Sequence, residues 1–540
     1  MLLCRAVRGS RRCLASIARP GVNEVYVPDP TSRPTLTPPT SPATAVTSRD
    51  AVDASHWSEK PWSAAEIAEA TKEHVMFTWG AQTPSLAWAP VITHGEGIYL
   101  YDADGKQYID WTSQAVCSNL GHTIPPAVRD AVVKQMDEVP FVYGGLGIAP
   151  VRARLSKLLA EVCPGDINGF LFPSSGAEAN EAAIRAARRF TGRQKILSRY
   201  RSYHGGTAST LTMTGDPRRW AAETNVGGFV HLMDPTPFNF AWGADESEIV
   251  DRSLAAMEET MMYEGTHTIA AVFLESIPGS GGVLIPPEGY IQGVRALCDK
   301  HDILLILDEV MLGFGRTGKM FGFQNFEGVL PDLVTFAKGI SGAYLPLSGV
   351  GMRQEIKEFF QTCVALCCVV LFPPFSPYHS PPSLGAHIDI FFVMKKSTLV
   401  RQPLGWGSTY NAHPTALACG YEVMKHILDN DIVARAKALE PVMADRMSSI
   451  VAKHNSVRQA RCVGLFGCFD LQGADGRMVQ QLHEPMPERV QAFKREMLDR
   501  GIYGLFRPPL LHCAPPLTIT EDELHDAFDR IDGALDVLDF

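Results

Sequence analysis

The chain of 540 residues lacks features that define several other classes of protein. It has no excess of basic residues, because 49 Lys and Arg stand against 59 Asp and Glu, a formal net charge of -10. Nucleic-acid binding needs clustered Lys and Arg, so the composition argues against it. The apolar runs are too short to span a bilayer, and we expect no membrane association. The 12 cysteines lack C-x-x-C spacing, which favours reduced thiols in an intracellular compartment.

The chain does have enough apolar sequence to form a large buried core. Hydrophobic side chains make up 46% of it and charged side chains 20%, as expected of a globular protein. Its length predicts more than one structural unit.

The N-terminal segment differs in composition from the rest. It has no acidic residue before Glu24, and its apolar residues are interleaved with arginines: Arg5, Arg8, Arg11, Arg12 and Arg19. This pattern is typical of an organelle transit peptide, and we expect import into the mitochondrial matrix. A disordered basic tail is the alternative. The Pro-, Ser- and Thr-rich stretch that follows cannot pack a core and is interpreted as a linker, so residues 1–56 form leader and linker.

The rest of the chain has the pattern of an α/β protein. SAAEIAEATKEHV predicts a helix, and the alternation around Asp104-Gly105 predicts a β-hairpin. From about Ala127 to Leu345, helical stretches alternate with the β-rich runs GFLFPSS, KILSRY, IAAVFLES, ILLILDEV and LVTFAKG, which predicts a mostly parallel, helix-covered sheet. Thr520 and Glu523 predict a capping box in the last helix. The predicted divisions are 57–126, a first part of a small domain; 127–415, a large domain; and 416–540, the rest of the small domain.

The motif FPSSGAEANEAAIRAARRF joins the end of a predicted strand to the start of a helix. The first amides of a helix are unpaired and lie at the positive end of its dipole, so they favour an anion such as phosphate. Many helices begin with Ser-Ser-Gly for capping alone.

Two further motifs place charged residues at strand ends. ILLILDEV carries Asp308 and Glu309 to the carboxyl end of an apolar strand, where open sheets bind ligands and a buried carboxylate needs a cationic partner. In LVTFAKGISGAYLPLSG, Lys338 follows the next strand, one crossover later, and small residues leave room around its amine. A lone lysine at a strand end is usually solvated.

The fourth motif, YHGGTAST, places Tyr203 and His204 after the KILSRY strand. An aromatic side chain there belongs to the core or covers a flat ring.

Together these motifs resemble the class III aminotransferases of the type I pyridoxal-phosphate fold. SSGAEANEAAIR, YHG, LDEVMLGFGRTG, FAKGISGAYLPLSG and GWGSTYNAHPTALA occur in the family's order, from about His74 to the C-terminus with one break. The resemblance implies a large domain with a mostly parallel sheet and a small α/β domain built from both chain ends. It also implies transamination with pyridoxal 5'-phosphate as cofactor.

The resemblance assigns the main catalytic roles. Lys338 would carry the cofactor as a Schiff base, and Asp308 would keep its pyridine nitrogen protonated. Tyr203 would stack on one face of the ring and Val310 would pack on the other. A protonated pyridine ring accepts electrons from the substrate, and Lys338, once displaced, is free to act as the general base.

The phosphate group of the cofactor has its own set of expected contacts. Ser175, Gly176 and Ala177 would bind it through backbone and hydroxyl donors, and Thr409 would reach it from the partner subunit. The resemblance therefore implies a homodimer with shared active sites. Two more residues match family positions near the site: Glu275, which we expect among the cofactor contacts, and Arg316, which we expect to bind substrate.

GFGRTG at Gly313 to Gly318 also fits the G-x-G-x-x-G dinucleotide fingerprint, with Asp332 at a suitable distance. That fingerprint requires a helix to open at its last glycine. KMFGFQNFEGVLPD carries glycines and a proline there, which argues against nicotinamide binding.

The substrate is less clearly indicated. Ornithine-like relatives have an arginine two residues before the A-P-P-L turn, where this chain has His512, so the chain is more similar to the ω-transaminase branch. That branch takes β-alanine, 4-aminobutyrate or taurine and uses pyruvate or a similar keto acid as acceptor. Arg507 is a candidate clamp for a carboxylate or sulfonate, or else a solvated surface arginine.

One segment matches no family motif. Residues 363–401 contain three cysteines and several prolines and show neither helical nor strand periodicity. A structureless loop of this length is rare in a compact domain, so our hypothesis is a translated intron or another gene-model error. A membrane-interacting or regulatory insertion is the alternative. For the whole chain, the alternatives to an active transaminase are a catalytically silent relative and another pyridoxal-phosphate reaction, such as decarboxylation or aminomutation.

Overall fold

The computed structural model describes residues 61–76, 89–220, 226–237, 240–361, 403–480 and 486–540. The chain divides into two units, residues 1–89 with 480–486 and residues 90–479 with 487–540. In the first unit, the predicted helix is α1 (Ala64–His74). The Ser63 hydroxyl accepts from the Glu66 amide and the Glu66 carboxylate accepts from the Ser63 amide, so a complete capping box starts this helix.

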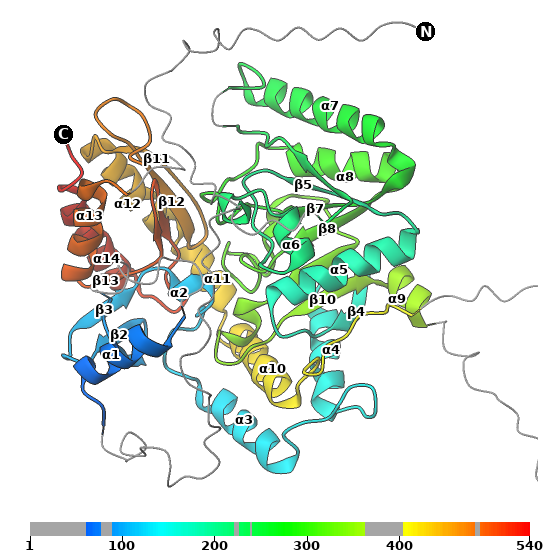
Figure 1. The fold of residues 1–540 in the computed structure, drawn as a ribbon, viewed down its shortest axis with the longest axis horizontal. Coiled ribbons are helices and arrows are strands. Elements are labelled where there is room, and N and C mark those ends of the chain that lie inside the picture. The colour runs from blue at the N-terminus through cyan, green and yellow to red at the C-terminus, as the bar shows by residue number, and fades with distance from the viewer. Residues whose placement is uncertain (1–60, 77–88, 221–225, 238–239, 362–402, 481–485) are drawn as a thin grey trace, which may run out of the picture. The chain divides into compact units, whose positions relative to one another are not determined.

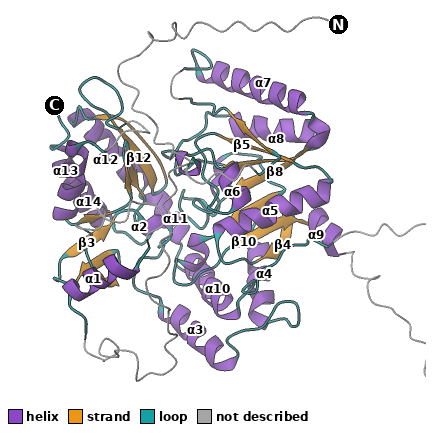
Figure 2. Cartoon of the chain, viewed as in Figure 1, coloured by secondary structure: helices purple, strands orange, loops and turns teal. Residues whose placement is uncertain are grey.

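The second unit contains the large sheet, and its seven strands follow the order β4-β10-β9-β8-β7-β5-β6 (Figures 1 and 2). The strands are Ile167–Leu171 (β4), Lys195–Arg199 (β5), Phe229–Leu232 (β6), Ile269–Glu275 (β7), Leu304–Asp308 (β8), Leu333–Phe336 (β9) and Gly349–Arg353 (β10). Of these described strands, only β10 is antiparallel to its neighbours, so the sheet is mostly parallel as predicted. β8 and β9 are parallel neighbours, which confirms the single crossover between Asp308 and Lys338.

The helices of this unit surround the strands (Figure 2). They are Ser113–Val116 (α2), Pro126–Glu138 (α3), Pro150–Val162 (α4), Gly176–Thr191 (α5), Ala208–Met213 (α6), Glu246–Glu264 (α7), Tyr290–Lys300 (α8), Gln354–Gln361 (α9), Pro414–Asp429 (α10), Ile432–Ala438 (α11), Glu440–Lys453 (α12), Glu488–Asp499 (α13) and Glu521–Leu535 (α14). None of the helices in the described residues is long and apolar enough to cross a membrane.

Helix α5 packs directly on the sheet because the face that it buries consists mainly of alanines. Ala179, Ala183 and Ala186 recur at helical spacing and are fully buried against strand residues such as Phe273 and Ile306. Alanine side chains let a helix approach a sheet closely. The N-terminus of α5 is therefore fixed near the carboxyl ends of the strands, where a site is expected.

Two smaller sheets complete the unit, and one of them joins the two ends of the chain. The first sheet has the order β1-β2-β3-β13, with strands Ile92–Glu96, Tyr99–Asp102, Gln107–Asp110 and Ile502–Tyr503. The second has the order β11-β12-β15-β14, with strands Val457–Val463, Phe466–Leu471, Leu510–Cys513 and Phe506–Arg507. The hairpin predicted at Asp104-Gly105 is β2 and β3, and the capping box predicted at Thr520 and Glu523 starts α14.

Candidate active site

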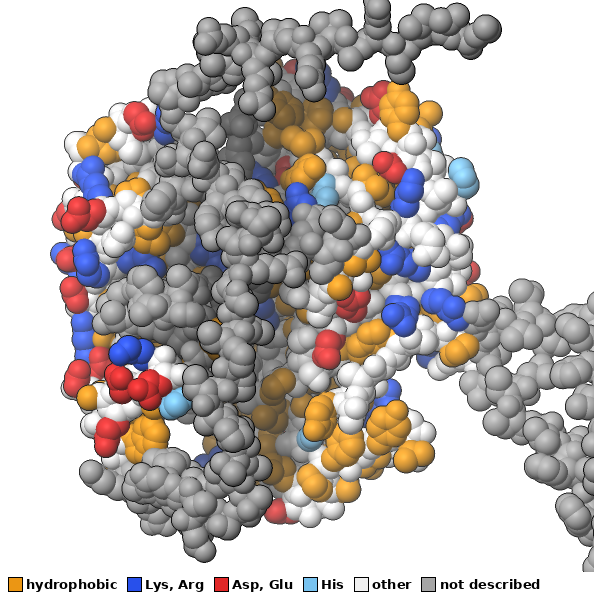
Figure 3. Space-filling view, in the orientation of Figure 1, with side chains coloured by type: hydrophobic (Ala, Val, Ile, Leu, Met, Phe, Trp, Pro, Cys, Tyr) orange, Lys and Arg blue, Asp and Glu red, His pale blue; other side chains and the backbone are white. Residues whose placement is uncertain are grey.

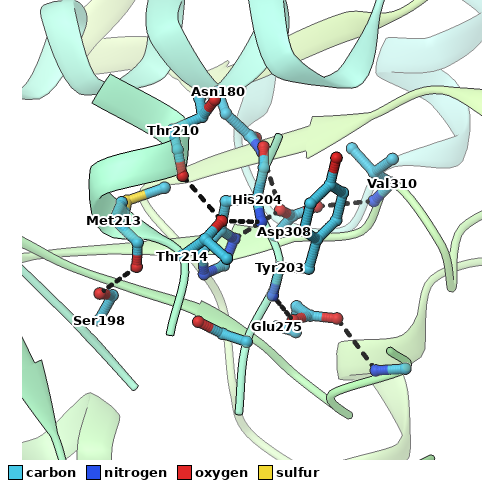
Figure 4. Close-up of polar contacts among 12 residues, drawn as sticks. Asn180, Ser198, Tyr203, His204, Thr210, Met213, Thr214, Glu275, Asp308 and Val310 are labelled. Atoms are coloured by element: carbon cyan, nitrogen blue, oxygen red, sulfur yellow. Dashed lines mark hydrogen bonds and ion pairs between the residues drawn. The ribbon is translucent and has the colours of Figure 1, made fainter. Parts of the chain in front are cut away.

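The site lies at the carboxyl ends of β7, β8 and β9, where three polar side chains of the large sheet meet. Glu275 ends β7, Asp308 ends β8, and the two are register partners. Lys338 follows β9 at the start of a 3-10 turn, Lys338–Ser341. Figure 4 shows Glu275 and Asp308 beside Tyr203, His204 and the start of the loop after β8.

Asp308 is held by three hydrogen-bond donors in a buried position, with a relative exposure of 3%. Its Oδ2 accepts from Asn180 Nδ2 at 2.9 Å and contacts His204 Nδ1 at 2.8 Å. Its Oδ1 accepts from the Val310 amide at 3.0 Å. These donors satisfy a carboxylate that has lost its hydration.

Lys338 is half-buried and has a left-handed backbone conformation, with φ +49°. Burial lowers the pKa of its amine, while the nearby Cys117 thiol, Asp308 and Glu275 act in the opposite direction. Backbone strain of this kind clusters at active sites, where surrounding structure enforces it. The amine thus belongs to the same electrostatic cluster as Asp308.

The start of α5 leaves two amides open beside this cluster. The Glu178 carboxylate accepts from the Ser174 and Ser175 amides, and the Ser175 hydroxyl accepts from the Glu178 amide. The amides of Gly176 and Ala177 have no hydrogen-bond partner among the described residues. Two unpaired amides at a helix N-terminus form a place for an anionic oxygen.

Close packing around these amides depends on two glycines. A Cβ on Gly176 would lie 2.8 Å from Val310 Cγ1, and a Cβ on Gly205 would lie 2.6 Å from Ala177 Cβ. The loops after β5 and β8 therefore come up against the start of α5 only because both positions lack a side chain.

Tyr203 is anchored by its backbone and covered by an arginine. The Tyr203 amide donates to Glu275 Oε1, and the Gly279 amide donates to Glu275 Oε2, each at 3.0 Å. The guanidinium carbon of Arg218 lies 3.6 Å from the centroid of the Tyr203 ring, and Asp216 holds this guanidinium by two hydrogen bonds. Glu275 thus fixes Tyr203, and burial raises the pKa of Glu275.

Glu309 differs from the expectation that a buried carboxylate has a cationic partner. It is fully buried, and its oxygens accept from the Ser276 hydroxyl and from the amides of Gly322 and Phe323. Burial raises its pKa to about 7. Three neutral donors replace the cation that the sequence led us to expect, and Glu309 holds the loop after β8.

Arg316 is fully buried. Its Nη1 donates to the Leu465 and Pro515 carbonyl oxygens, and its Nη2 donates to Ser113 Oγ and Asn119 Oδ1. It braces the segment from Ser113 to Asn119, in which three non-glycine residues have positive φ. A role of Arg316 in substrate binding stays a prediction, and the structure shows a bracing role. The GFGRTG segment around it opens no α-helix, which excludes the dinucleotide fingerprint.

Arg507 lies in β14, near enough to Lys338 and Tyr203 for the charges to interact. Its guanidinium has no hydrogen bond or ion pair with any described residue. Burial and the nearby Arg218 lower its pKa to about 10, and its charge in turn lowers the pKa of Lys338. Arg507 is therefore a protonated cation at neutral pH that lies close to the lysine and to Tyr203.

His512 is buried in the adjacent strand, and its Nε2 lies 3.0 Å from the Gly279 carbonyl oxygen. Burial lowers its pKa to about 4, so this side chain is neutral at physiological pH. Thr409, by contrast, is exposed, and no hydrogen bond among the described residues joins it to the cluster. Its expected contact with the partner's cofactor stays a prediction.

Two residues of the cluster received no role from the sequence. Asn180 lies within the quoted SSGAEANEAAIR motif, and His204 follows Tyr203, but neither has a signal of its own. A polar residue on the buried alanine face of α5 is the one pattern that could have singled out Asn180.

The arrangement fits pyridoxal phosphate. Asp308 offers a buried anion, Lys338 an amine, and Gly176 and Ala177 a pair of open amides for a phosphate. The lack of a side chain at Gly176 and Gly205 lets the loops after β5 and β8 come close to the start of α5. When bound, the cofactor supplies an electron sink for the substrate's reacting carbon.

Comparisons with known proteins agree with this geometry. The family model for Aminotransferase class-III matches residues 82–364 and 383–535. The chain is 36% identical to a structure of taurine:2-oxoglutarate aminotransferase from Bifidobacterium kashiwanohense in complex with PLP and glutamate, with a TM-score of 0.77, covering 88% of this chain and 98% of that one. An (S)-enantioselective omega-transaminase from Thermomicrobium roseum gives 33% identity and a TM-score of 0.76, covering 89% and 100%. Taurine--pyruvate aminotransferase of Rhodobacter capsulatus is 31% identical over 499 residues, 89% of this chain and 99% of its own.

The chain belongs to the class III aminotransferases. It is an enzyme of the type I pyridoxal-phosphate fold, and pyridoxal 5'-phosphate is its cofactor.

Proposed function

We propose that the enzyme transfers an amino group from an ω-amino acid or related amine to a keto acid such as pyruvate. The observation that carries this proposal is the unpaired Arg507 guanidinium near Lys338 and Tyr203. A half-buried cation without an anionic partner is costly, and a carboxylate or sulfonate of the substrate would pair with it in a forked geometry.

The position of Arg507 relative to Lys338 suits a substrate with separated charges. The amine must react next to Lys338, while an acidic group at the other end of the molecule would bind Arg507. Taurine and β-alanine have this form, and two of the relatives named above act on taurine by name. The neutral His512 supports the same proposal, because it offers no second cation for an α-carboxylate.

The proton steps fall to the chain's own residues. The Lys338 amine is placed to take and return the proton at the substrate's reacting carbon. Asp308 would hold the cofactor's ring nitrogen in its protonated form, since its carboxylate is buried and accepts from three donors.

The donor is tested by following the half-reaction spectroscopically with β-alanine, taurine, 4-aminobutyrate and an uncharged amine. In Arg507→Ala we expect KM to rise about ten- to a hundredfold for the acidic donors and little for the uncharged amine. Arg458→Ala is the matched control, because Arg458 is an exposed arginine of β11. An equal effect of Arg507→Ala on charged and uncharged donors would contradict the clamp.

We also propose that the chain forms a homodimer through the loop between α3 and α4. Leu146 and Ile148 are 89% and 79% exposed, and Tyr143 is 50% exposed. Figure 3 shows hydrophobic side chains gathered in the region of α3 and α4. The Tyr410 ring contacts Phe141 of the same loop, so the neighbouring Thr409 lies beside this apolar surface. Exposed apolar patches of this kind favour a protein partner, and a partner copy here would bring Thr409 to a shared site.

Light scattering tests the dimer. Leu146→Glu with Ile148→Glu should give a monomer that retains cofactor weakly, whereas Tyr263→Glu, at an 85% exposed position of α7, should leave the mass unchanged. A dimer that survives the double substitution would contradict the proposed interface.

The leader and the unmatched segment lie outside the described residues, and both remain proposals. We propose mitochondrial import of the chain, tested by fusing residues 1–56 to a fluorescent protein and replacing the five arginines by glutamine. Retained import of the substituted leader would contradict the transit-peptide interpretation. The family model leaves residues 365–382 unmatched, within the segment 363–401 that we propose to be foreign to the enzyme.

A further inference from the structure

We infer that His204 and Asn180 are positioning residues: they occupy Oδ2 of Asp308 and so direct the cofactor's ring N–H to its other oxygen, Oδ1. The inference rests on the cofactor class and is independent of the amino donor proposed above. Asn180 and His204 are both buried, and each would then have a function beyond packing in the core.

The hydrogen bonds of Asp308 account for each lone pair that its carboxylate offers. A carboxylate oxygen accepts about two hydrogen bonds. Oδ2 is occupied by Asn180 Nδ2 and His204 Nδ1, whereas Oδ1 accepts only from the Val310 amide among the described residues. One acceptor position therefore remains, and it is on Oδ1.

His204 can take part only through Nδ1. Its side chain is fully buried, its Nε2 has no hydrogen-bond partner among the described residues, and its ring contacts the edge of Phe273 with centroids 5.3 Å apart. Nδ1 must donate, because Asp308 Oδ2 is an acceptor. The imidazole thus acts as a single fixed N–H donor, and Nε2 is idle.

Asn180 and Thr214 hold the backbone of His204 in place (Figure 4). The two hydrogens of Asn180 Nδ2 go to Asp308 Oδ2 and to the His204 carbonyl oxygen, at 2.9 and 2.7 Å. The His204 amide donates to Thr214 Oγ1, which in turn donates to the Thr210 carbonyl oxygen. These bonds fix the His204 backbone beside Asp308, and the contact with Phe273 confines its ring.

The neighbourhood of Asp308 makes these donors necessary. Glu275 ends the adjacent strand as its register partner, so a second buried carboxylate lies alongside. Neighbouring carboxylates and burial both favour the protonated acid. Without the donors on Oδ2, two acceptor positions of a buried carboxylate would lose their partners, and the ring N–H would no longer be confined to Oδ1. The electron sink would then weaken.

The experiment compares His204→Asn, His204→Phe and Asn180→Ser in the holoenzyme. The amide nitrogen introduced by His204→Asn would occupy roughly the place of Nδ1, so this variant should preserve the donor, and His204→Phe should keep the bulk and lose the donor. The readouts are the ¹⁵N chemical shift of ring-labelled pyridoxal phosphate, the pH dependence of its visible band, and its dissociation constant. His301→Asn is the matched control. His301 follows α8, and its ring contacts the Glu258 carboxylate and not Asp308.

We expect His204→Phe and Asn180→Ser to move the ring-nitrogen signal toward the unprotonated value, shift the band's titration, and weaken cofactor binding roughly tenfold. His204→Asn and the control should resemble the wild type. If His204→Phe does not fold, Asn180→Ser and His204→Asn still decide the question. Wild-type ring-nitrogen signals in Asn180→Ser, or in a folded His204→Phe, would overturn the inference. A His204→Asn variant that loses the protonated signal would do the same.

Discussion

Gly176, the first residue of α5, lies against Val310, the second residue after β8, so closely that a Cβ on Gly176 would be 2.8 Å from Val310 Cγ1. This contact brings the open amides of α5 next to the strand that ends in Asp308. The site therefore depends on a missing side chain at one position and on a branched one at the other.

The first prediction follows from this contact. Gly176→Ala should lower the free energy of unfolding by about 1–3 kcal/mol and weaken cofactor binding, because overpacking displaces either α5 or the Val310 loop. Val310→Ala in the same chain should restore much of the stability. Urea unfolding and cofactor fluorescence measure the two effects. Gly192→Ala is the control: Gly192 has a left-handed backbone at the end of α5 and open space around it, so this substitution adds backbone strain without crowding. Additive losses in the double variant would argue against the contact.

The sequence predicted the parts of this fold that depend on periodicity. Five strands and the placement of Asp308 and Lys338 followed from apolar runs and their spacing. β10 was not predicted, because Gly349 and Gly351 weaken strand propensity. In the folded chain Gly349 is needed for close packing, since a Cβ at this position would lie 2.2 Å from Phe336. Contacts across sheets and helices carry no local signal, so the pairing of His204 and Asn180 on Asp308 required the folded chain.

A second prediction concerns Lys338. Its pKa in the folded chain is below the usual 10.5, mainly through burial, so the folded state binds this proton more weakly than the unfolded state does. The lysine therefore destabilises the cofactor-free protein at neutral pH, and the penalty disappears as pH rises toward 10.5. Lys338→Met should unfold at higher urea than the wild type at pH 7, with a difference that shrinks at alkaline pH.

The same variant should lose at least about a hundredfold in transamination rate, since the general base is gone. Lys425→Met is the control and should lower the stability at pH 7. A hydrogen bond to Glu422 raises the pKa of Lys425, so folding favours the charged form of this lysine. Greater stability of wild-type apoprotein than of Lys338→Met at pH 7 would show that the lysine is not penalised by burial.

The C-terminal end of the chain gives a third prediction. The fully buried His454 side chain lies between two carboxylates, with Nδ1 2.6 Å from Asp539 Oδ2 and Nε2 2.8 Å from Asp532 Oδ1. Burial alone would raise the pKa of both acids, but hydrogen bonds from Lys453, His454 and Ser456 outweigh it and lower both below 3.8. Such acids contribute stability above pH 3.8 that is lost as the pH falls through their folded values.

His454→Leu should lower the free energy of unfolding by about 1–3 kcal/mol at pH 7 and make the acid loss below pH 4 shallower, because the two carboxylates lose a shared donor. Thermal unfolding over a pH series measures both. His525→Leu, at a half-exposed position of α14, should do neither. An unchanged acid profile in His454→Leu would mean that this clamp does not stabilise the C-terminus.

The last prediction concerns the segment 363–401. The described residues on both sides of it attach to adjacent positions of α5. The Phe359 ring of α9 packs edge-on against Phe190 at 5.2 Å, and Arg189 Nη2 donates to the Pro403 carbonyl oxygen at 3.2 Å. Leu404 then packs against the buried core that α5 forms with the sheet. Both flanks are therefore fixed to the same helix.

Because each flank has its own anchor on α5, a chain without residues 363–401 should fold with a free energy of unfolding within about 0.5 kcal/mol of the full chain, and should bind cofactor at least as well. Leu404→Asp in the shortened chain is the control that must destabilise, since it places a charge against the apolar core. Transcript sequencing across Thr362 to Pro403 asks the same question of the gene. Two results would show that these residues belong to the functional protein: a shortened chain that is insoluble while the full-length enzyme folds, or a mature message that retains the segment. Either result would support a regulatory insertion next to Thr409.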